Sequence, residues 1–257
     1  MNALLTAMTA AAREAGALLK DRPAPAPGRT METLRSTFAS VDEPVAALLR
    51  ERLDGLVPDA VWADELDTEL PETGAVWVVD AIDGAVQYLR GMPYWCVSLA
   101  LVRDREPVAA VLHSAVLGET YTAAPGEGAH RNGVPVVPAG EGELAAAIVA
   151  TSQPPFPSGQ PEAVAAAGRG LSAAVREVAA VRNLGPVSWQ VADVAAGRLD
   201  AFWEYGRDDA NLLAGALIAR EAGAVVTDMA GRPWRAGAEG FLVSSGALHG
   251  ELLRVLA

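Results

Sequence analysis

Two aspartates at the end of an apolar run are the residues of this chain best suited to chemistry. Residues 77–88 read WVVDAIDGAVQY: the apolar run stops at Asp80, a second carboxylate follows at Asp83, and Gly84 permits a tight turn into a helix N-terminus. Two carboxylates three residues apart on a turn can share hard divalent cations, and the backbone amides that follow can hold a phosphate. The alternative is that both aspartates only form the turn and cap the next element.

Helices and strands on either side must position these carboxylates. Apolar residues recur at helical spacing over residues 3–20 and again over 42–56, where Asp42 is a suitable N-cap at a loop-to-helix junction. Apolar runs rich in β-branched residues predict strands in the first half at 60–63, 76–79, 95–102, 108–112 and 120–123. Asn132-Gly133 predicts a hairpin turn.

The second half alternates between the two kinds of element. Strands are expected at 147–151, 201–203, 224–228 and 241–244. Helices are expected at 161–171, 187–196 and 212–222, and a proline-rich surface loop, QPPFPSGQP, precedes the first of them. This alternation is typical of an α/β protein in which helices pack on the faces of mixed sheets.

Composition narrows the classes of partner. The 257 residues carry a net charge of -12 with a pI near 4.7, which disfavours binding to nucleic acid or to anionic membrane surfaces. Cys96 is the only cysteine, so no intrachain disulfide can form, and its apolar neighbours predict a buried small side chain. No segment reaches the roughly 18 uncharged apolar residues of a membrane span, and no signal peptide is apparent. We therefore expect a cytoplasmic protein.

The wider pattern around the two aspartates resembles the inositol monophosphatase family. Residues 77–102 are similar to that family's signature, in which a strand leads into D-P-I-D-G-T-x-N-F, then G-x-P and V-S-x-A-L. Residues 62–65, WADE, stand where the family has G-E-E, and Ser40-Val41-Asp42 stands where it has T-x-x-D. Four later segments follow in family order: AAPGEGAHRNGVPV, AAGRLDAFWE, LLAGALIAREAGAVVTDMAGRPW and GFLVSSGALHGELL.

The resemblance covers nearly the whole chain and implies a fold. The family's fold is an α/β architecture, the layered αβαβα sandwich of the inositol monophosphatase and sugar phosphatase type. It implies an N-terminal α+β lobe over residues 1–140, carrying the D-x-x-D-G motif, and a C-terminal α/β lobe over 141–257 that completes the cleft. It also implies a homodimer.

The resemblance further implies a magnesium site. In family members magnesium ions hold the substrate phosphate, and a metal-bound water attacks phosphorus in line. Carried over to this chain, Asp80 would bridge two ions and Asp83 would bind the second. The Ile82 carbonyl and Asp64 would serve the first ion, and Asp42 would orient the water. The catalytic set is then Asp42, Asp64 and Asp80.

Other positions match the groups that hold the substrate in the family. The amides of Gly84 and Ala85 would receive the phosphate, and Glu204 would contact substrate hydroxyls. Sequence alone allows Glu204 to be a solvated carboxylate at a strand end instead. Asp208 is expected beside the substrate, and it or Asp209 could supply a charge that is lost from the metal site. The same two residues could equally be solvated loop charges.

That charge is lost because the chain departs from the family pattern at several positions. The threonine after D-G, whose hydroxyl helps to activate the attacking water, is Ala85. The last metal carboxylate is Asn211, which offers an oxygen but no charge. The G-S pair before a helix is Gly185-Pro186, and Asp64 is shorter than the family's glutamate. We therefore expect magnesium to bind weakly or with partial occupancy.

Three functions are compatible with these residues. The leading hypothesis is an enzyme acting on a small phosphorylated metabolite by magnesium-dependent phosphomonoester hydrolysis, with a degraded site. The second is a repurposed enzyme of specialised biosynthesis that uses the acidic cleft without phosphoryl transfer. The third is a silent pseudo-phosphatase that binds a ligand. Retained Asp42, Asp80 and Asp83 argue against the third. Ala85 and Asn211 argue against an ordinary phosphatase.

Overall fold

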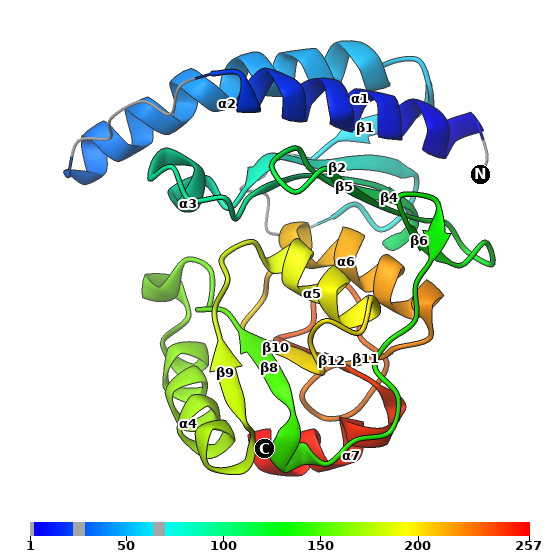
Figure 1. Cartoon of the computed structure of the whole chain (residues 1–257). Helices are drawn as coiled ribbons and strands as arrows, with labels where there is room; N and C mark the ends of the chain where they lie inside the picture. Colours follow the sequence, from blue (N-terminus) through cyan, green and yellow to red (C-terminus); the bar gives the residue numbers. More distant parts are fainter. Residues whose placement is uncertain (1–2, 23–28, 64–69) are drawn as a thin grey trace.

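Two β-sheets alternate with three layers of helices through the molecule (Figure 1). The computed structural model describes residues 3–22, 29–63 and 70–257. In these ranges the outer helices α1 (Ala3–Lys20) and α2 (Met31–Leu53) cover the first sheet. Helices α5 (Val187–Ala195) and α6 (Asp209–Ala222) lie between the sheets, and α4 (Pro161–Glu177) and α7 (Gly246–Leu256) cover the far face of the second. The αβαβα layering predicted from the sequence is confirmed.

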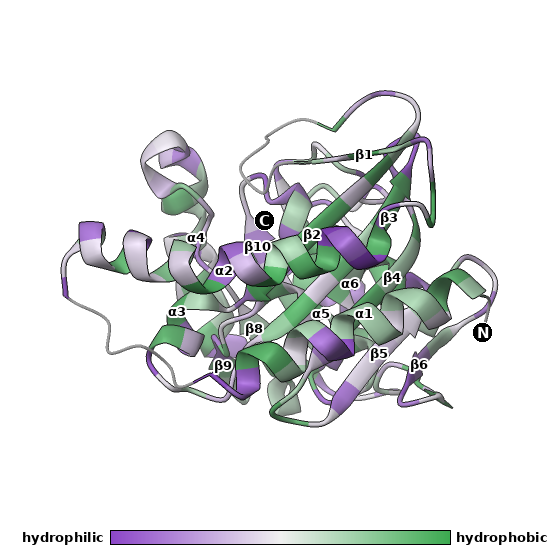
Figure 2. Ribbon diagram, turned by 90° about the horizontal axis from the view of Figure 1, so that it is seen from above, coloured by the Kyte–Doolittle hydropathy of each residue, from purple (hydrophilic) through white to green (hydrophobic). Residues whose placement is uncertain are grey.

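The first sheet contains the strand that ends at the two aspartates. Within the described residues its order is β1-β2-β3-β4-β5-β6-β7, with β1 parallel to β2 and the other pairs antiparallel. The strands are β1 (Ala60–Trp62), β2 (Ala75–Asp83), β3 (Cys96–Arg103), β4 (Glu106–Ser114), β5 (Glu119–Ala123), β6 (Ala129–Arg131) and β7 (Val134–Pro135). The short helix α3 (Ala85–Leu89) follows β2. Figure 2 shows the apolar strand β2 beneath α2.

The second sheet has the order β11-β12-β10-β8-β9 within the described residues. Its strands are β8 (Ile148–Thr151), β9 (Ala180–Arg182), β10 (Ala201–Tyr205), β11 (Val225–Thr227) and β12 (Gly240–Ser244). Single 3-10 turns, η1 (Leu144–Ala146) and η2 (Pro157–Gly159), precede β8 and α4. The central strand β10 pairs parallel to β8 and antiparallel to β12, so the sheet is mixed, as the sequence predicts.

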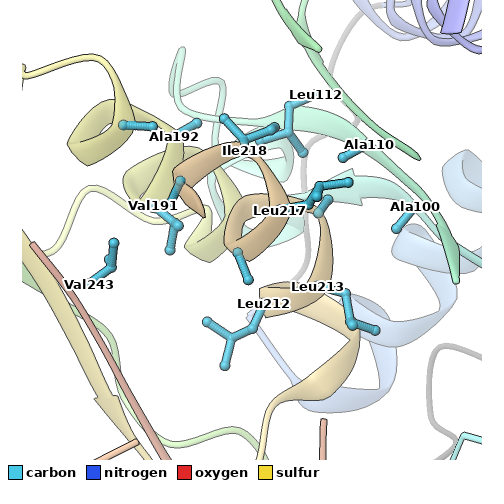
Figure 3. Close-up of a cluster of buried hydrophobic side chains, with 14 of the residues drawn as sticks. Ala100, Ala110, Leu112, Val191, Ala192, Leu212, Leu213, Leu217, Ile218 and Val243 are labelled. Carbon is cyan, nitrogen blue, oxygen red and sulfur yellow. The ribbon is translucent and has the colours of Figure 1, made fainter. Parts of the chain in front are cut away.

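The layer between the sheets is the core that fixes α5 and α6. Figure 3 shows apolar side chains of both helices packed together with side chains of both sheets: Ala100, Ala110, Leu112, Val191, Ala192, Leu212, Leu213, Leu217, Ile218 and Val243. Because close packing in such a core is sensitive to a single methylene, the two helices are held in fixed positions. Their N-termini are therefore rigid supports for polar side chains. Since this core combines both halves of the chain, the division into lobes at residue 140 stays a prediction.

Most elements match their predicted ranges, and α2 is the main exception. The prediction that a helix starts at Asp42 is wrong, because α2 begins at Met31 and places Asp42 in its interior. The Thr30 side chain accepts a hydrogen bond from the Thr33 amide, and Thr33 Oγ1 accepts one from the Thr30 amide, which closes a capping box. Pro44 lies inside this longer helix.

Other local predictions fare better. The hairpin turn is confirmed: Arg131 pairs with Val134, and Asn132 and Gly133 between them have φ of 52° and 79°. Cys96 is fully buried, as predicted. The sequence analysis missed α7 and the short strands β6, β7 and β9. In the described residues no helix is long and apolar enough to cross a membrane.

Candidate active site

The turn after β2 presents two buried carboxylates. Asp80 pairs with Ser98 and Asp83 with Cys96, and the register shifts between them, so the strand is irregular where the two aspartates lie. Asp80 Oδ1 accepts a hydrogen bond from the Ile82 amide at 2.8 Å, which holds the turn in shape. Both aspartates are only 6% exposed. The irregularity therefore directs two adjacent acids into the interior.

Gly84 makes this turn possible. It has a φ of 93°, a left-handed conformation that favours glycine. A Cβ atom there would lie 2.7 Å from the Tyr94 carbonyl oxygen and 3.0 Å from Pro186 Cγ. The amides that the resemblance assigns to phosphate therefore belong to a backbone that only glycine can form.

The N-terminus of α5 holds the second aspartate. Asp83 Oδ2 accepts hydrogen bonds from the Ser188 amide at 3.0 Å and from the Ser188 hydroxyl. Cys96 Sγ lies 4.0 Å from the same oxygen. Burial raises the pKa of Asp83 to about 6, and the hydrogen bonds from Ser188 and from the Val187 amide oppose that rise. One oxygen of Asp83 is thus already engaged by the protein.

A third carboxylate reaches the same region from the second sheet. Phe202 of β10 packs in the layer of α5 and α6, whereas Trp203 packs on the side of α4 and α7. Because side chains alternate along a strand, Glu204 points with Phe202 toward α5 and α6. It is 1% exposed, and neither carboxylate oxygen has a hydrogen-bond partner in the structure. Burial raises the pKa of Glu204 well above its usual value, and repulsion from Asp208 and Asp83 adds to the rise.

The N-terminus of α6 completes the cluster. The Asn211 side-chain amide donates a hydrogen bond to Asp208 Oδ1 at 2.8 Å. Burial raises the pKa of Asp208 to about 7, the bond from Asn211 opposes this, and the charge of Asp83 adds to it. Asp209 is engaged elsewhere, because it accepts hydrogen bonds from the Gly237 amide at 2.7 Å and from Arg207 Nε at 3.1 Å. Of the two acids suggested as replacements, Asp208 is therefore the one that lies in the cluster.

Asp42 lines a pocket on the α2 side of the first sheet. Asp42 and Arg50 of α2 line a pocket of about 370 Å³ together with Trp62 and with residues of β2. The Arg50 guanidinium lies 4.5 Å from the centre of the Trp62 ring, and Trp62 Nε1 donates to Asp54 Oδ1 at 3.0 Å. Burial, followed by the nearby charge of Glu43, raises the pKa of Asp42.

Not every predicted site residue can be placed. Asp64 lies outside the described residues, so the predicted convergence of Asp42, Asp64, Asp80 and Asp83 stays a prediction. Sequence reasoning missed Ser188, which is fully buried and bonds to Asp83. The available signal was a hydroxyl in the first turn of an otherwise apolar helix, VSWQVADVA.

The residues present can be compared with what magnesium needs. Mg²⁺ prefers oxygen ligands in near-octahedral geometry, and the Asp80 carboxylate and the Ile82 carbonyl supply such oxygens at one turn. Both are oxygen donors of the kind that Mg²⁺ takes. At the second position Asp83 Oδ2 is bonded to Ser188, and the Asn211 amide is bonded to Asp208. In the part of the chain that the structure describes, no three His, Cys, Asp or Glu side chains are grouped to hold a metal. The second position does not fit an ion as it stands.

Because the buried Glu204 carboxylate has no hydrogen-bond partner, we expect its substitution to change the stability of the protein in a pH-dependent way. A carboxyl group whose pKa is raised by folding binds protons more tightly in the folded state, so it destabilises the fold as pH rises above its unfolded value. Glu204→Gln should therefore gain stability relative to the parent between pH 5 and pH 8, by at least about 1 kcal/mol. Urea unfolding in EDTA measures this difference. His113 and His249, whose pKa values are lowered by burial, act in the opposite sense but equally in both proteins.

Glu251→Gln is the matched control, because Glu251 is exposed on α7. It should change stability by less than about 0.5 kcal/mol at either pH. A stability difference between Glu204→Gln and the parent that is constant across this pH range would mean that Glu204 has a partner in solution.

Comparison with known proteins agrees with this arrangement of elements. The sequence profile of the Inositol monophosphatase family matches residues 1–257. The chain is 37% identical over 155 residues to an inositol-1-monophosphatase of Mesorhizobium japonicum, which covers 60% of the chain and 57% of that protein. It is 30% identical over 239 residues to Nus factor SuhB of Haemophilus influenzae, which covers 89% of the chain and 86% of that protein.

A solved structure shows the same likeness in three dimensions. The crystal structure of extragenic suppressor protein suhB from Bartonella henselae superimposes with a TM-score of 0.83 at 26% identity, covering 99% of each chain. Fold, profile and sequence identity all lead to one conclusion: the chain belongs to the inositol monophosphatase family.

Proposed function

We propose that this chain is a magnesium-dependent phosphomonoesterase for a small phosphorylated metabolite, and that it works with one ion at Asp80. The observation that carries the proposal is a group of three buried acids from separate elements: Asp83 of β2, Glu204 of β10 and Asp208 before α6. Asp83 is held there by the Ser188 amide at the N-terminus of α5. Family membership supports phosphatase-like chemistry at this place.

Each part of the site has a proposed role. Asp80, the Ile82 carbonyl and Asp64 would hold the ion, which when bound supplies positive charge to the phosphate. The amides of Gly84 and Ala85 would fix the phosphate. Asp83, bonded to Ser188, would set the position of the turn. Glu204, with Asp208 beside it, would contact the rest of the substrate.

The second candidate is a protein of this fold without phosphatase activity, either a repurposed enzyme or a ligand-binding pseudo-phosphatase. The observation that favours it is the engagement of both second-position groups, Asp83 with Ser188 and Asn211 with Asp208. Under this hypothesis the acidic cluster would bind a ligand without transferring its phosphoryl group.

Magnesium binding and phosphate release together test the proposal. We expect calorimetry on the free protein to detect at most one Mg²⁺ site of sub-millimolar affinity, because Asn211 removes a charge from the second position. Phosphate release from a panel of sugar, inositol and amino-alcohol phosphates should require Mg²⁺ and stop in EDTA. Two tight sites in the free protein would mean that Asp208 replaces the missing ligand. Magnesium binding without any turnover would favour the second candidate.

A further inference from the structure

The Glu204 carboxylate is a buried acid without a hydrogen-bond partner among the described residues. Both of its oxygens are buried, and neither has a hydrogen-bond partner in the structure. It lies on the face of β10 that points to α5 and α6, where Asp83 and Asp208 are its charged neighbours. An isolated buried carboxylate is costly, so such a group indicates a partner that completes it.

The residues that the structure describes do not supply that partner. None of the ion pairs between described residues includes Glu204, Asp83 or Asp208. Arg207, the nearest arginine in sequence, forms an ion pair with Asp209. Ser188 and Asn211 donate hydrogen bonds to the two aspartates but carry no charge. Within the described residues, the cluster therefore has neither a hydrogen-bond donor for Glu204 nor a positive charge.

The missing hydrogen-bond donors and the missing positive charge indicate the chemistry of the partner. A ligand hydroxyl would donate one hydrogen bond and bring no charge, whereas a protonated primary amine brings three donors and one positive charge. Hydrogen bonds between ionised groups are also roughly twice as strong as neutral ones. A metal ion is a poorer match, because the described side chains do not group three ligands around one point.

We propose that the metabolite bound at this acidic cluster carries a protonated primary amine, which pairs with Glu204 beside Asp208 while its phosphate lies at the Asp80 turn. The inference rests on the proposed function for the phosphate end only. Under this proposal, Glu204 selects amino phosphomonoesters over the corresponding hydroxyl compounds.

Two matched pairs of compounds test the inference. Glucosamine 6-phosphate and glucose 6-phosphate differ only by amine or hydroxyl, as do 2-aminoethyl phosphate and 2-hydroxyethyl phosphate, which have a shorter spacing. Calorimetry at pH 7 with Mg²⁺ gives Kd, and phosphate release gives turnover. In at least one pair the amine should bind about tenfold more tightly or better, as expected for a buried charge-assisted contact.

Variants separate the role of Glu204 from general electrostatics. Glu204→Gln keeps the shape of the side chain and should reduce the amine preference to about threefold or less, while Glu251→Gln should leave it unchanged. Asp208→Asn should weaken the amine preference in part. It provides a second measurement of that preference if Glu204→Gln folds poorly. No amine preference in either pair, or a preference that survives Glu204→Gln, would overturn the inference. Preferential binding of amines without hydrolysis would overturn the proposed function and leave the inference intact.

Discussion

Asp80→Asn should lower magnesium-dependent phosphate release at least about a hundredfold, the size of loss seen when one preorganised electrostatic group is removed from an active site. The substitution removes the charge that would hold the ion. It keeps the turn, because an asparagine oxygen can still accept the hydrogen bond that Asp80 Oδ1 receives from the Ile82 amide. Turnover and Mg²⁺ affinity should fall together, while the melting temperature changes little.

Asp59→Asn is the matched control. Asp59 is exposed and forms only a long surface contact with Arg103, at 3.5 Å. Its variant should keep the parent's rate and Mg²⁺ affinity, because exposed ion pairs contribute at most about 1 kcal/mol. If Asp80→Asn also kept both, the acidic turn would not be the place where the ion acts.

Restoring two family residues should raise activity. The double variant Ala85→Thr with Asn211→Asp should hydrolyse an inositol phosphate or a generic phosphomonoester at least about tenfold faster than the parent, which corresponds to roughly 1.4 kcal/mol of barrier. Ala85→Thr returns a hydroxyl to the start of α3, and Asn211→Asp returns a charge to the second metal position. Because both groups serve one displacement, their effects should be cooperative, and neither single variant need reach the gain.

The structure adds a condition to this result. Asn211 now donates a hydrogen bond to Asp208, so Asn211→Asp places two carboxylates where one amide and one carboxylate lay. Like charges at that distance repel, so the single variant should be less stable than the parent without metal and recover when Mg²⁺ is added. Thermal unfolding with and without Mg²⁺ measures this recovery. A double variant that binds two ions yet gains nothing across the panel would remove the support for phosphatase chemistry.

High turnover by the unsubstituted protein would contradict the expectation that Ala85 and Asn211 weaken its activity. Turnover in the usual enzyme range of about 1 to 1,000 per second would show that Ala85 and Asn211 are compensated. Asp208 is then the first residue to substitute, because it is the acid bonded to Asn211.

The sequence by itself determined the acidic turn and the mixed sheets with helices on their faces, and its resemblance to the family determined the layered fold. Strand β2 and the turn at Gly84 could be predicted locally, because an apolar run, two aspartates and a glycine follow one another in the sequence. Gly84 has the left-handed φ that favours glycine. Helical spacing likewise predicted α1 at its observed bounds. The start of α2 was predicted wrongly because the apolar spacing begins near Asp42, a suitable N-cap, whereas the capping box at Thr30 extends the helix over residues that show little apolar periodicity.

Only the tertiary structure decided what surrounds the two aspartates. Ser188 is 105 residues from Asp83 in sequence, and no local pattern states that the N-terminus of α5 meets this carboxylate. The same holds for Glu204, which could equally have been a solvated strand end. Its burial follows from the position of β10 at the centre of the second sheet, with its Phe202 face against α5 and α6. Contacts between distant elements depend on how the layers pack, and packing depends on many residues at once, so the charge environment of the site emerges only when the chain is folded.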